Sequence, residues 1–231
     1  MDLRLPAAHE KARIVEHMFN RISGRYDLLN RVISLGLDRA WRRRTIACLG
    51  LKPGQRLLDL ACGTGDLSEL AARAGTQVVG VDFSQGMLEQ AEAREIDAEL
   101  LRADAARLPF ADRSFDAMTC GFALRNFADL AVVFHETARV LKTGARIALL
   151  EVDEPANPLV ASLHRLYFGR LVPLAGRLLS DRAAYSYLPA SASYLPSREK
   201  LREMLEDAGF DDVNHQRLAA GAVQIVSATR S

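Results

Sequence analysis

The sequence contains little cysteine and no long uncharged apolar run. Its three cysteines, Cys48, Cys62 and Cys120, are widely spaced and form no C-x-x-C pair, so we expect no metal or redox site built on cysteine. No apolar run approaches the roughly 18 residues of a membrane-spanning helix. The first residues also lack the apolar stretch and cleavage site of a secretory signal. These absences favour a cytoplasmic protein that binds no metal.

The chain also has almost no net charge. Its 30 Lys and Arg residues against 29 Asp and Glu residues give a formal charge of +1, so we expect no nucleic-acid partner. With 49% hydrophobic residues, the 231-residue chain can bury a sizeable core. The near-zero net charge is the sum of segments with opposite charges. Residues 51–160 carry eleven basic and seventeen acidic side chains, whereas the flanking segments are basic overall.

Short apolar runs alternate with helical stretches in the middle of the chain, which predicts parallel β-α-β units and a doubly wound sheet. The predicted strands are 56–61, 77–82, 98–102, 115–121 and 145–153, and the helices between them are 66–74, 85–94 and 130–141. Three helices are predicted before the sheet, at 11–21, 27–34 and 38–49. After the fifth strand, leucines recur at helical spacing over 159–178, followed by a helix at 198–208 and strands at 212–218 and 222–228 that form a hairpin.

A glycine-containing loop follows the first strand and opens the next helix. Gly63 and Gly65 let the backbone turn sharply and approach a ligand. Asp82 closes the second strand, where a carboxylate can accept both hydroxyl groups of a ribose. This pattern indicates a nucleoside cofactor.

The residues around the loop favour S-adenosylmethionine over a nucleotide. A dinucleotide fingerprint requires a third glycine where Ser68 stands, and no Walker lysine is present. The acidic Asp59 near the loop suits the ammonium group of a methyl donor better than it suits a pyrophosphate. Asp104 and Ala105 follow the third strand, where an acidic side chain can accept a hydrogen bond from the adenine amino group. The predicted fold is therefore a Rossmann-like class I S-adenosylmethionine-dependent methyltransferase, with a mostly parallel seven-stranded sheet and a C-terminal antiparallel hairpin.

Several motifs resemble those of the ubiquinone/menaquinone biosynthesis C-methyltransferases. The similar segments are Tyr26-Asp-Leu-Leu-Asn30, Ser34-Leu-Gly36, Trp41-Arg42, Asp59 to Asp66, Leu108 to Phe110, Leu124-Arg-Asn126 and Arg139-Val-Leu-Lys142. The resemblance implies methyl transfer from S-adenosylmethionine to a ring carbon of a polyprenylated quinol, either demethylmenaquinol or the benzoquinol precursor of ubiquinone. It also implies donor contacts from Thr64, Asp82, Asp104 and Ala105.

The same resemblance places Tyr26, Arg125 and Asn126 near the acceptor. We hypothesise that Arg125 stabilises a phenolate and that Asn126 and Tyr26 orient the quinol or a proton-accepting water. The alternative is that Arg125 pairs with a surface acid while Asn126 caps the next helix.

The chain departs from the family pattern at Leu29, Asp38, Gly121, Thr143, Ala145 and Asp153. Gly121 stands where a serine that contacts the donor is common, and Asp153 replaces a serine. These two departures are the main support for another function, O- or N-methylation of a different small molecule. A donor-binding protein without catalysis is a third possibility.

The predicted organisation is one domain: an N-terminal helical cap at 1–50, a cofactor-binding core at 51–155, a helical acceptor lid at 156–210 and the hairpin at 211–231. Because a polyprenyl acceptor resides in a membrane, we expect peripheral contact with the inner face of the membrane. The leucine-rich segment 159–178 and the basic segment 41–44 are the predicted contact, as an apolar channel with a cationic rim. The alternative is an amphipathic helix that faces the core and leaves its arginines in solvent. A second copy of the chain, as a homodimer, is a further candidate partner.

Overall fold

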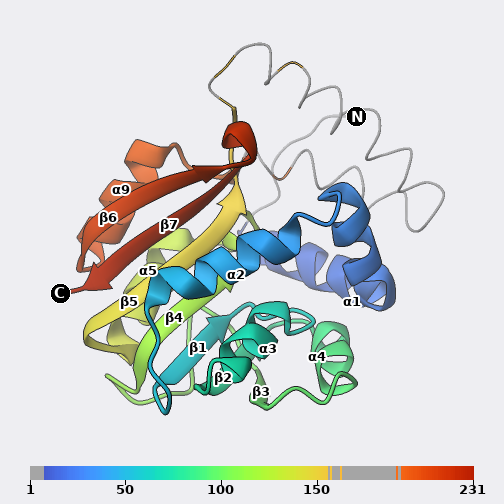
Figure 1. Ribbon diagram of the computed structural model, residues 1–231, viewed down its shortest axis with the longest axis horizontal. Helices are drawn as coiled ribbons and strands as arrows, with labels where there is room; N and C mark the ends of the chain where they lie inside the picture. The colour runs from blue at the N-terminus through green and yellow to red at the C-terminus, as the bar shows by residue number, and fades with distance from the viewer. Residues whose placement is uncertain (1–7, 156, 158–161, 163–190, 192–193) are drawn as a thin grey trace.

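The computed structural model describes residues 8–155, 157, 162, 191 and 194–231. Seven strands form one sheet in the order β3-β2-β1-β4-β5-β7-β6 (Figure 1). The strands are β1 (Arg56–Leu60), β2 (Gln77–Asp82), β3 (Ala98–Arg102), β4 (Phe115–Gly121), β5 (Leu141–Val152), β6 (Phe210–Leu218) and β7 (Val223–Arg230). The first five are parallel, whereas β7 runs antiparallel to both β5 and β6. The predicted fold is confirmed.

Helices cover both faces of the sheet, which explains why its central strands are apolar on both sides. On one face, Leu57 of β1 shares a buried cluster with Ile46 of α2 (Asp38–Leu49) and with Leu67 of α3 (Asp66–Arg73). On the other face, Leu58 lies in the larger cluster, which includes side chains from α5 (Leu130–Val140) and α9 (Arg198–Asp207). Because Leu57 and Leu58 are both fully buried, this strand forms the centre of the core.

The N-terminal helix α1 (Ala8–Ile33) is continuous, so the predicted separation into helices 11–21 and 27–34 was wrong. The predicted break centred on Gly24, yet this glycine lies on the exposed side of the helix with no atom near its missing side chain. A glycine there costs only about 1 kcal/mol relative to alanine. Contacts on both sides of Gly24 outweigh that cost.

Those contacts anchor α1 over the carboxyl ends of the strands. The side chain of Asn20 accepts hydrogen bonds from the Ser84 hydroxyl (2.7 Å) and from the Gly86 amide (2.9 Å), both at the start of α4 (Gln85–Glu92). Asp27 accepts a hydrogen bond of 2.6 Å from the hydroxyl of Thr64. These bonds hold α1, from the predicted N-terminal cap, against the loops at the carboxyl ends of β1 and β2.

The basic segment 41–44 does not form the predicted surface rim. Trp41 packs with the buried residues Leu150 and Ile225, and Arg42 is only 6% exposed. The guanidinium group of Arg42 is paired with Asp38 at 2.5 Å. Because Trp41 and Arg42 point inward, that prediction was wrong for these two residues. The leucine segment 159–178 and most of the predicted lid lie outside the described residues.

The C-terminal hairpin is confirmed, with a short 3-10 turn, η4 (Ala219–Gly221), between its strands. The fifth strand starts at Leu141, four residues earlier than predicted, because Leu141 pairs with Phe115 before a register shift in β4. Among the described residues, no helix combines the length and apolar character required to cross a membrane.

Candidate active site

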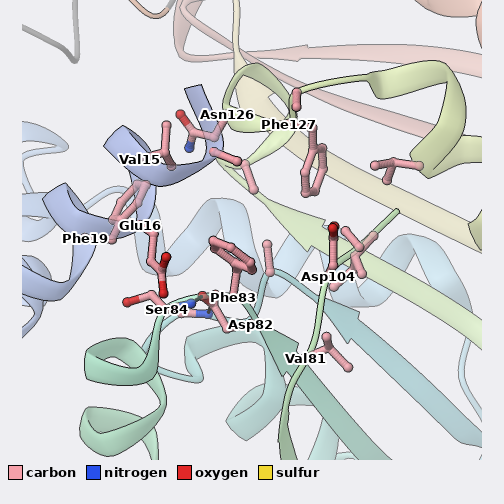
Figure 2. A pocket seen from close by; sticks show the side chains of 18 of the residues that line it. Val15, Glu16, Phe19, Val81, Asp82, Phe83, Ser84, Asp104, Asn126 and Phe127 are labelled. Carbon is pink, nitrogen blue, oxygen red and sulfur yellow. Dashed lines mark hydrogen bonds between the residues drawn. The ribbon is translucent and has the colours of Figure 1, made fainter. Parts of the chain in front are cut away.

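A pocket opens at the carboxyl ends of β1, β2 and β4, under α1 (Figure 2). This edge is where ligands bind in open α/β sheets. Seven of the eleven residues predicted for the site line the pocket: Tyr26, Gly63, Asp82, Asp104, Ala105, Gly121 and Asn126. The other four, Asp59, Thr64, Gly65 and Arg125, lie behind its wall.

The loop after β1 requires backbone angles that favour glycine. Ala61, Gly63 and Gly65 all have positive φ, at 55°, 56° and 84°. A β carbon on Gly65 would lie 2.5 Å from Cδ1 of Ile96, whereas nothing lies within 4 Å of the position beside Gly63. Gly65 is thus required for packing, and Gly63 leaves open space where a ligand can approach the backbone.

Asp82 connects this loop to the end of β2. One carboxylate oxygen accepts the amide of Gly63 at 2.7 Å and the other accepts the amide of Ser84 at 2.8 Å. Burial raises the pKa of Asp82, and these amides offset part of the rise. Each carboxylate oxygen has two lone pairs, so both can still accept a hydroxyl group from a ribose.

The opposite wall of the pocket suits an aromatic base. Asp104 is exposed and accepts the amide of Ala106 through one oxygen, at 2.9 Å, which leaves its second oxygen for a ligand. Ala105 and Val133 provide apolar surface close to it in the pocket lining. A ribose-binding carboxylate next to an apolar wall with an acceptor fits the nucleoside part of S-adenosylmethionine.

Asp59 lies beneath the loop and does not line the pocket. It is fully buried; one oxygen accepts the Ser68 hydroxyl at 2.6 Å and the other has no hydrogen-bond partner. Burial raises the pKa of Asp59 to about 7. Through Ser68, Asp59 ties α3 to the end of β1, and its predicted place near the donor's ammonium group stays a prediction.

The predicted acceptor residues gather at the other end of the pocket. Tyr26 and Asn126 line it, from α1 and from the short helix η1 (Leu124–Asn126). Asn126 does not cap α5, because Asp129 performs that role by accepting the amides of Ala131 and Val132. Arg125 is buried and pairs with the buried Glu151, so the alternative of a surface ion pair is also excluded.

Both departures that favoured a different reaction have structural explanations. A β carbon on Gly121 would lie 2.8 Å from Cδ1 of Leu67, so the leucine occupies the space that a serine would need. Asp153 pairs with Arg198 at 2.7 Å, which ties the end of β5 to α9.

Apart from Tyr26, sequence motifs missed the pocket residues that α1 and the segments after β2 and η1 contribute. Glu16 and Phe19 come from α1, and the Glu16 carboxylate accepts a hydrogen bond of 2.8 Å from Arg102 of β3. Figure 2 shows Glu16 beside Ser84 and Asp82. An amphipathic pattern in α1 indicates a buried face but gives no sign of which partner covers it. No group of three or more potential metal ligands occurs within the described part of the chain.

The sheet order, the antiparallel last strand and the loop–carboxylate pocket define the class I S-adenosylmethionine-dependent methyltransferases. The chain is similar in structure to a protein from Thermotoga maritima described as an S-adenosylmethionine-dependent methyltransferase and possible histamine N-methyltransferase. The TM-score is 0.66, with 20% sequence identity over 94% of this chain and 99% of that one. At this identity the similarity establishes the fold alone.

Sequence comparison gives the family. The chain belongs to the ubiE/COQ5 methyltransferase family, whose sequence profile matches residues 7–230. It is 45% identical to the demethylmenaquinone methyltransferase of Roseiflexus sp. over 226 residues, covering 96% of this chain and 95% of the relative. It is 44% identical to the ubiquinone/menaquinone biosynthesis C-methyltransferase UbiE of Syntrophotalea carbinolica over 220 residues, covering 93% of each. The predicted family and its dependence on S-adenosylmethionine are thereby confirmed.

Proposed function

We propose that this protein methylates a ring carbon of demethylmenaquinol, with S-adenosylmethionine as the methyl donor. The observation that carries the proposal is the 45% identity, over nearly the whole chain, to a demethylmenaquinone methyltransferase. The benzoquinol precursor of ubiquinone is the second candidate acceptor, because the similar protein from Syntrophotalea carbinolica is named for both quinones.

The donor site in this proposal consists of the loop and its carboxylates. Asp82 accepts the ribose hydroxyls, Gly63 leaves room for the donor, Gly121 lines the pocket beside it, and Asp104 and Ala105 contact the adenine. Thr64, Gly65 and Asp59 support the loop: Thr64 through Asp27, Gly65 through its packing on Ile96, and Asp59 through Ser68. When bound, S-adenosylmethionine supplies an electrophilic methyl group, so that a carbon–carbon bond forms as the methyl–sulfur bond breaks.

The chain must make the acceptor carbon nucleophilic and align it. Tyr26 and Asn126 orient the quinol, and the positive charge of Arg125 stabilises the phenolate formed when a phenolic proton leaves. After transfer, the ring carbon loses its proton to a base or to a water held by these polar groups. Alignment of the reacting atoms alone can lower the barrier by about 7–11 kcal/mol.

A transfer assay with labelled S-adenosylmethionine tests the proposal. The acceptors are reduced demethylmenaquinone, reduced demethylated benzoquinone and a panel of simple phenols and amines. We expect the highest kcat/KM with demethylmenaquinol, because the relative that is 45% identical over nearly the whole chain is named for that acceptor. Transfer only to an amine or a simple phenol would contradict the proposal, and donor binding without any transfer would identify a non-catalytic protein.

We further propose that the corner between α1 and α2 contacts an anionic membrane. Large apolar side chains are exposed there: Leu28 (52%), Val32 (40%), Leu35 (76%) and Leu37 (49%). The exposed charged residues beside them, Arg31, Arg39 and Arg43, are all basic. The acidic residues of α1 between 11 and 33, Glu16 and Asp27, instead face inward, where they bind Arg102 and Thr64. An apolar surface with a cationic rim fits anionic lipid.

Replacing both Leu28 and Leu35 with serine should lower binding to vesicles about tenfold, because less apolar surface enters the lipid. Sedimentation with phosphatidylglycerol vesicles at low salt measures this effect. Ile14→Ser is the control, since Ile14 is 51% exposed on the same helix but more than three turns away. Equal binding by the wild type, the double variant and the control would contradict this contact surface.

A further inference from the structure

A buried ion pair lies behind the acceptor end of the pocket. The Nη1 group of Arg125 donates a hydrogen bond to Oε1 of Glu151, near the end of β5. The Nε group of Arg125 donates to the hydroxyl of Ser191 at 3.1 Å. The same Oε1 also accepts the amide of Val152 at 2.9 Å. Two of the three guanidinium nitrogens of Arg125 are thus held by side chains that lie 66 and 26 residues away in the sequence.

Stability alone does not account for this pair. Arg125 is 7% exposed and Glu151 is fully buried, and such a pair is commonly no more stabilising than apolar residues of similar volume. The second oxygen of Glu151, Oε2, is buried and has no hydrogen-bond partner in the part of the chain that the structure describes. An unsatisfied buried oxygen is a cost that folded proteins usually avoid unless the group has another role.

The pair adjoins the residues that face the acceptor. Arg125 immediately precedes Asn126, which lines the pocket. Burial raises the pKa of Tyr26, and the nearby positive charges of Arg42 and Arg125 offset part of that rise. The Arg125 charge therefore acts on a hydroxyl group inside the pocket. Within the described residues, Nη2 is the one nitrogen of this guanidinium group that makes no hydrogen bond. Because Arg125 does not itself line the pocket, its charge, and not a direct hydrogen bond, is what acts on the acceptor.

We infer that Glu151 is a positioning residue: it holds the guanidinium group of Arg125 in the place where that group stabilises the acceptor's negative charge. This inference rests on the proposed quinol methylation. Glu151 acts through Arg125, with Ser191 fixing the other edge of the guanidinium plane. A carboxylate is suited to this task because it keeps the buried pair neutral while it determines the distance and direction of Nη1.

The sharpest test is Glu151→Asp, which keeps the charge but withdraws the carboxylate by one methylene group. A displacement of about 1 Å can cost a hundredfold in rate, so we expect kcat with demethylmenaquinol to fall about a hundredfold. The KM for the quinol and the Kd for S-adenosylmethionine should stay within about threefold. Asp153→Asn is the matched control: it breaks the neighbouring ion pair with Arg198 at the end of the same strand and should leave kcat unchanged.

A double-mutant cycle with Arg125→Ala shows whether Glu151 acts through Arg125. The variant with both substitutions should be no slower than Arg125→Ala alone, because the second change has nothing left to displace. The inference would be overturned if the two substitutions lowered kcat independently, so that their separate effects multiplied in the double variant. An unchanged kcat in folded Glu151→Asp would overturn it as well. Should Glu151→Asp not fold, Glu151→Gln keeps the side-chain length and removes the negative charge; kcat should fall again, and an unchanged kcat in the folded variant would overturn the inference in the same way. A wild-type protein that does not methylate the quinol would instead refute the proposed function, so the two failures are distinguishable.

Discussion

Replacing Asp82 with asparagine should weaken the binding of S-adenosylmethionine about a hundredfold. In the present structure both carboxylate oxygens accept backbone amides, from Gly63 and Ser84. An asparagine turns one of these acceptors into a donor that faces an N–H group. It also removes the charge that strengthens bonds to the ribose hydroxyls, each worth about 1.5–3 kcal/mol. The loss of about 3 kcal/mol corresponds to roughly a hundredfold in Kd.

Isothermal titration calorimetry with the purified protein measures this effect without any acceptor. Asp116→Asn is the control, because Asp116 also accepts a backbone amide, from Arg56, but lies at the opposite end of the sheet, near the start of β4. The control should bind the donor as the wild type does. A Kd for Asp82→Asn within threefold of the wild-type value would remove Asp82 from the donor site.

The second large effect concerns Asp59 and the dependence of stability on pH. Burial raises the pKa of this carboxyl to about 7, whereas an unfolded chain releases the proton near pH 3.9. Between these values the folded chain holds a proton that the unfolded chain has lost. The contribution of Asp59 to the free energy of unfolding therefore falls as the pH rises from about 4 to about 7, by about 4 kcal/mol in total.

Asp59→Asn should abolish this contribution, because an amide keeps an oxygen for the Ser68 hydroxyl but has no proton to lose. Urea unfolding at pH 4.5 and pH 8 tests the prediction: the variant gains stability relative to the wild type as the pH rises. Asp116→Asn should stay parallel to the wild type between these two pH values, because bonds from the Arg56 amide and Lys142 lower the pKa of Asp116 and the carboxyl is then ionised in the folded and the unfolded chain at both. If the free energy of unfolding changed equally with pH in Asp59→Asn and in the wild type, the pKa of Asp59 would not be raised in the folded protein.

The sheet was predictable from the sequence because its signals are local. The apolar run of β1, the glycine loop and Asp82 occur at fixed spacings along one β-α-β unit. The continuity of α1 was not predictable, because it depends on Asn20 and Asp27 binding Ser84 and Thr64, which lie 64 and 37 residues away. A local break signal at Gly24 is overruled by contacts that only the folded chain contains.

The same distinction applies to the site. Motifs located the residues that line the pocket from the loops after the strands, such as Gly63, Asp82 and Asp104. They gave no sign of Glu151, because its importance depends on the pairing of β4 with β5, which brings it within reach of Arg125. They also gave no sign that Asp59 is fully buried beneath the loop, because that depends on how α3 packs against β1.

The proposed reaction is methylation of a quinol ring carbon in this pocket. The most direct measurement is the position of the new methyl group after reaction of demethylmenaquinol with S-adenosylmethionine carrying a carbon-13 methyl label. We predict that NMR shows the labelled methyl carbon bonded to a ring carbon of the product. The label should remain on the ring after the quinol is oxidised to the quinone. A label bonded to oxygen, or recovered only in unreacted donor, would contradict the account.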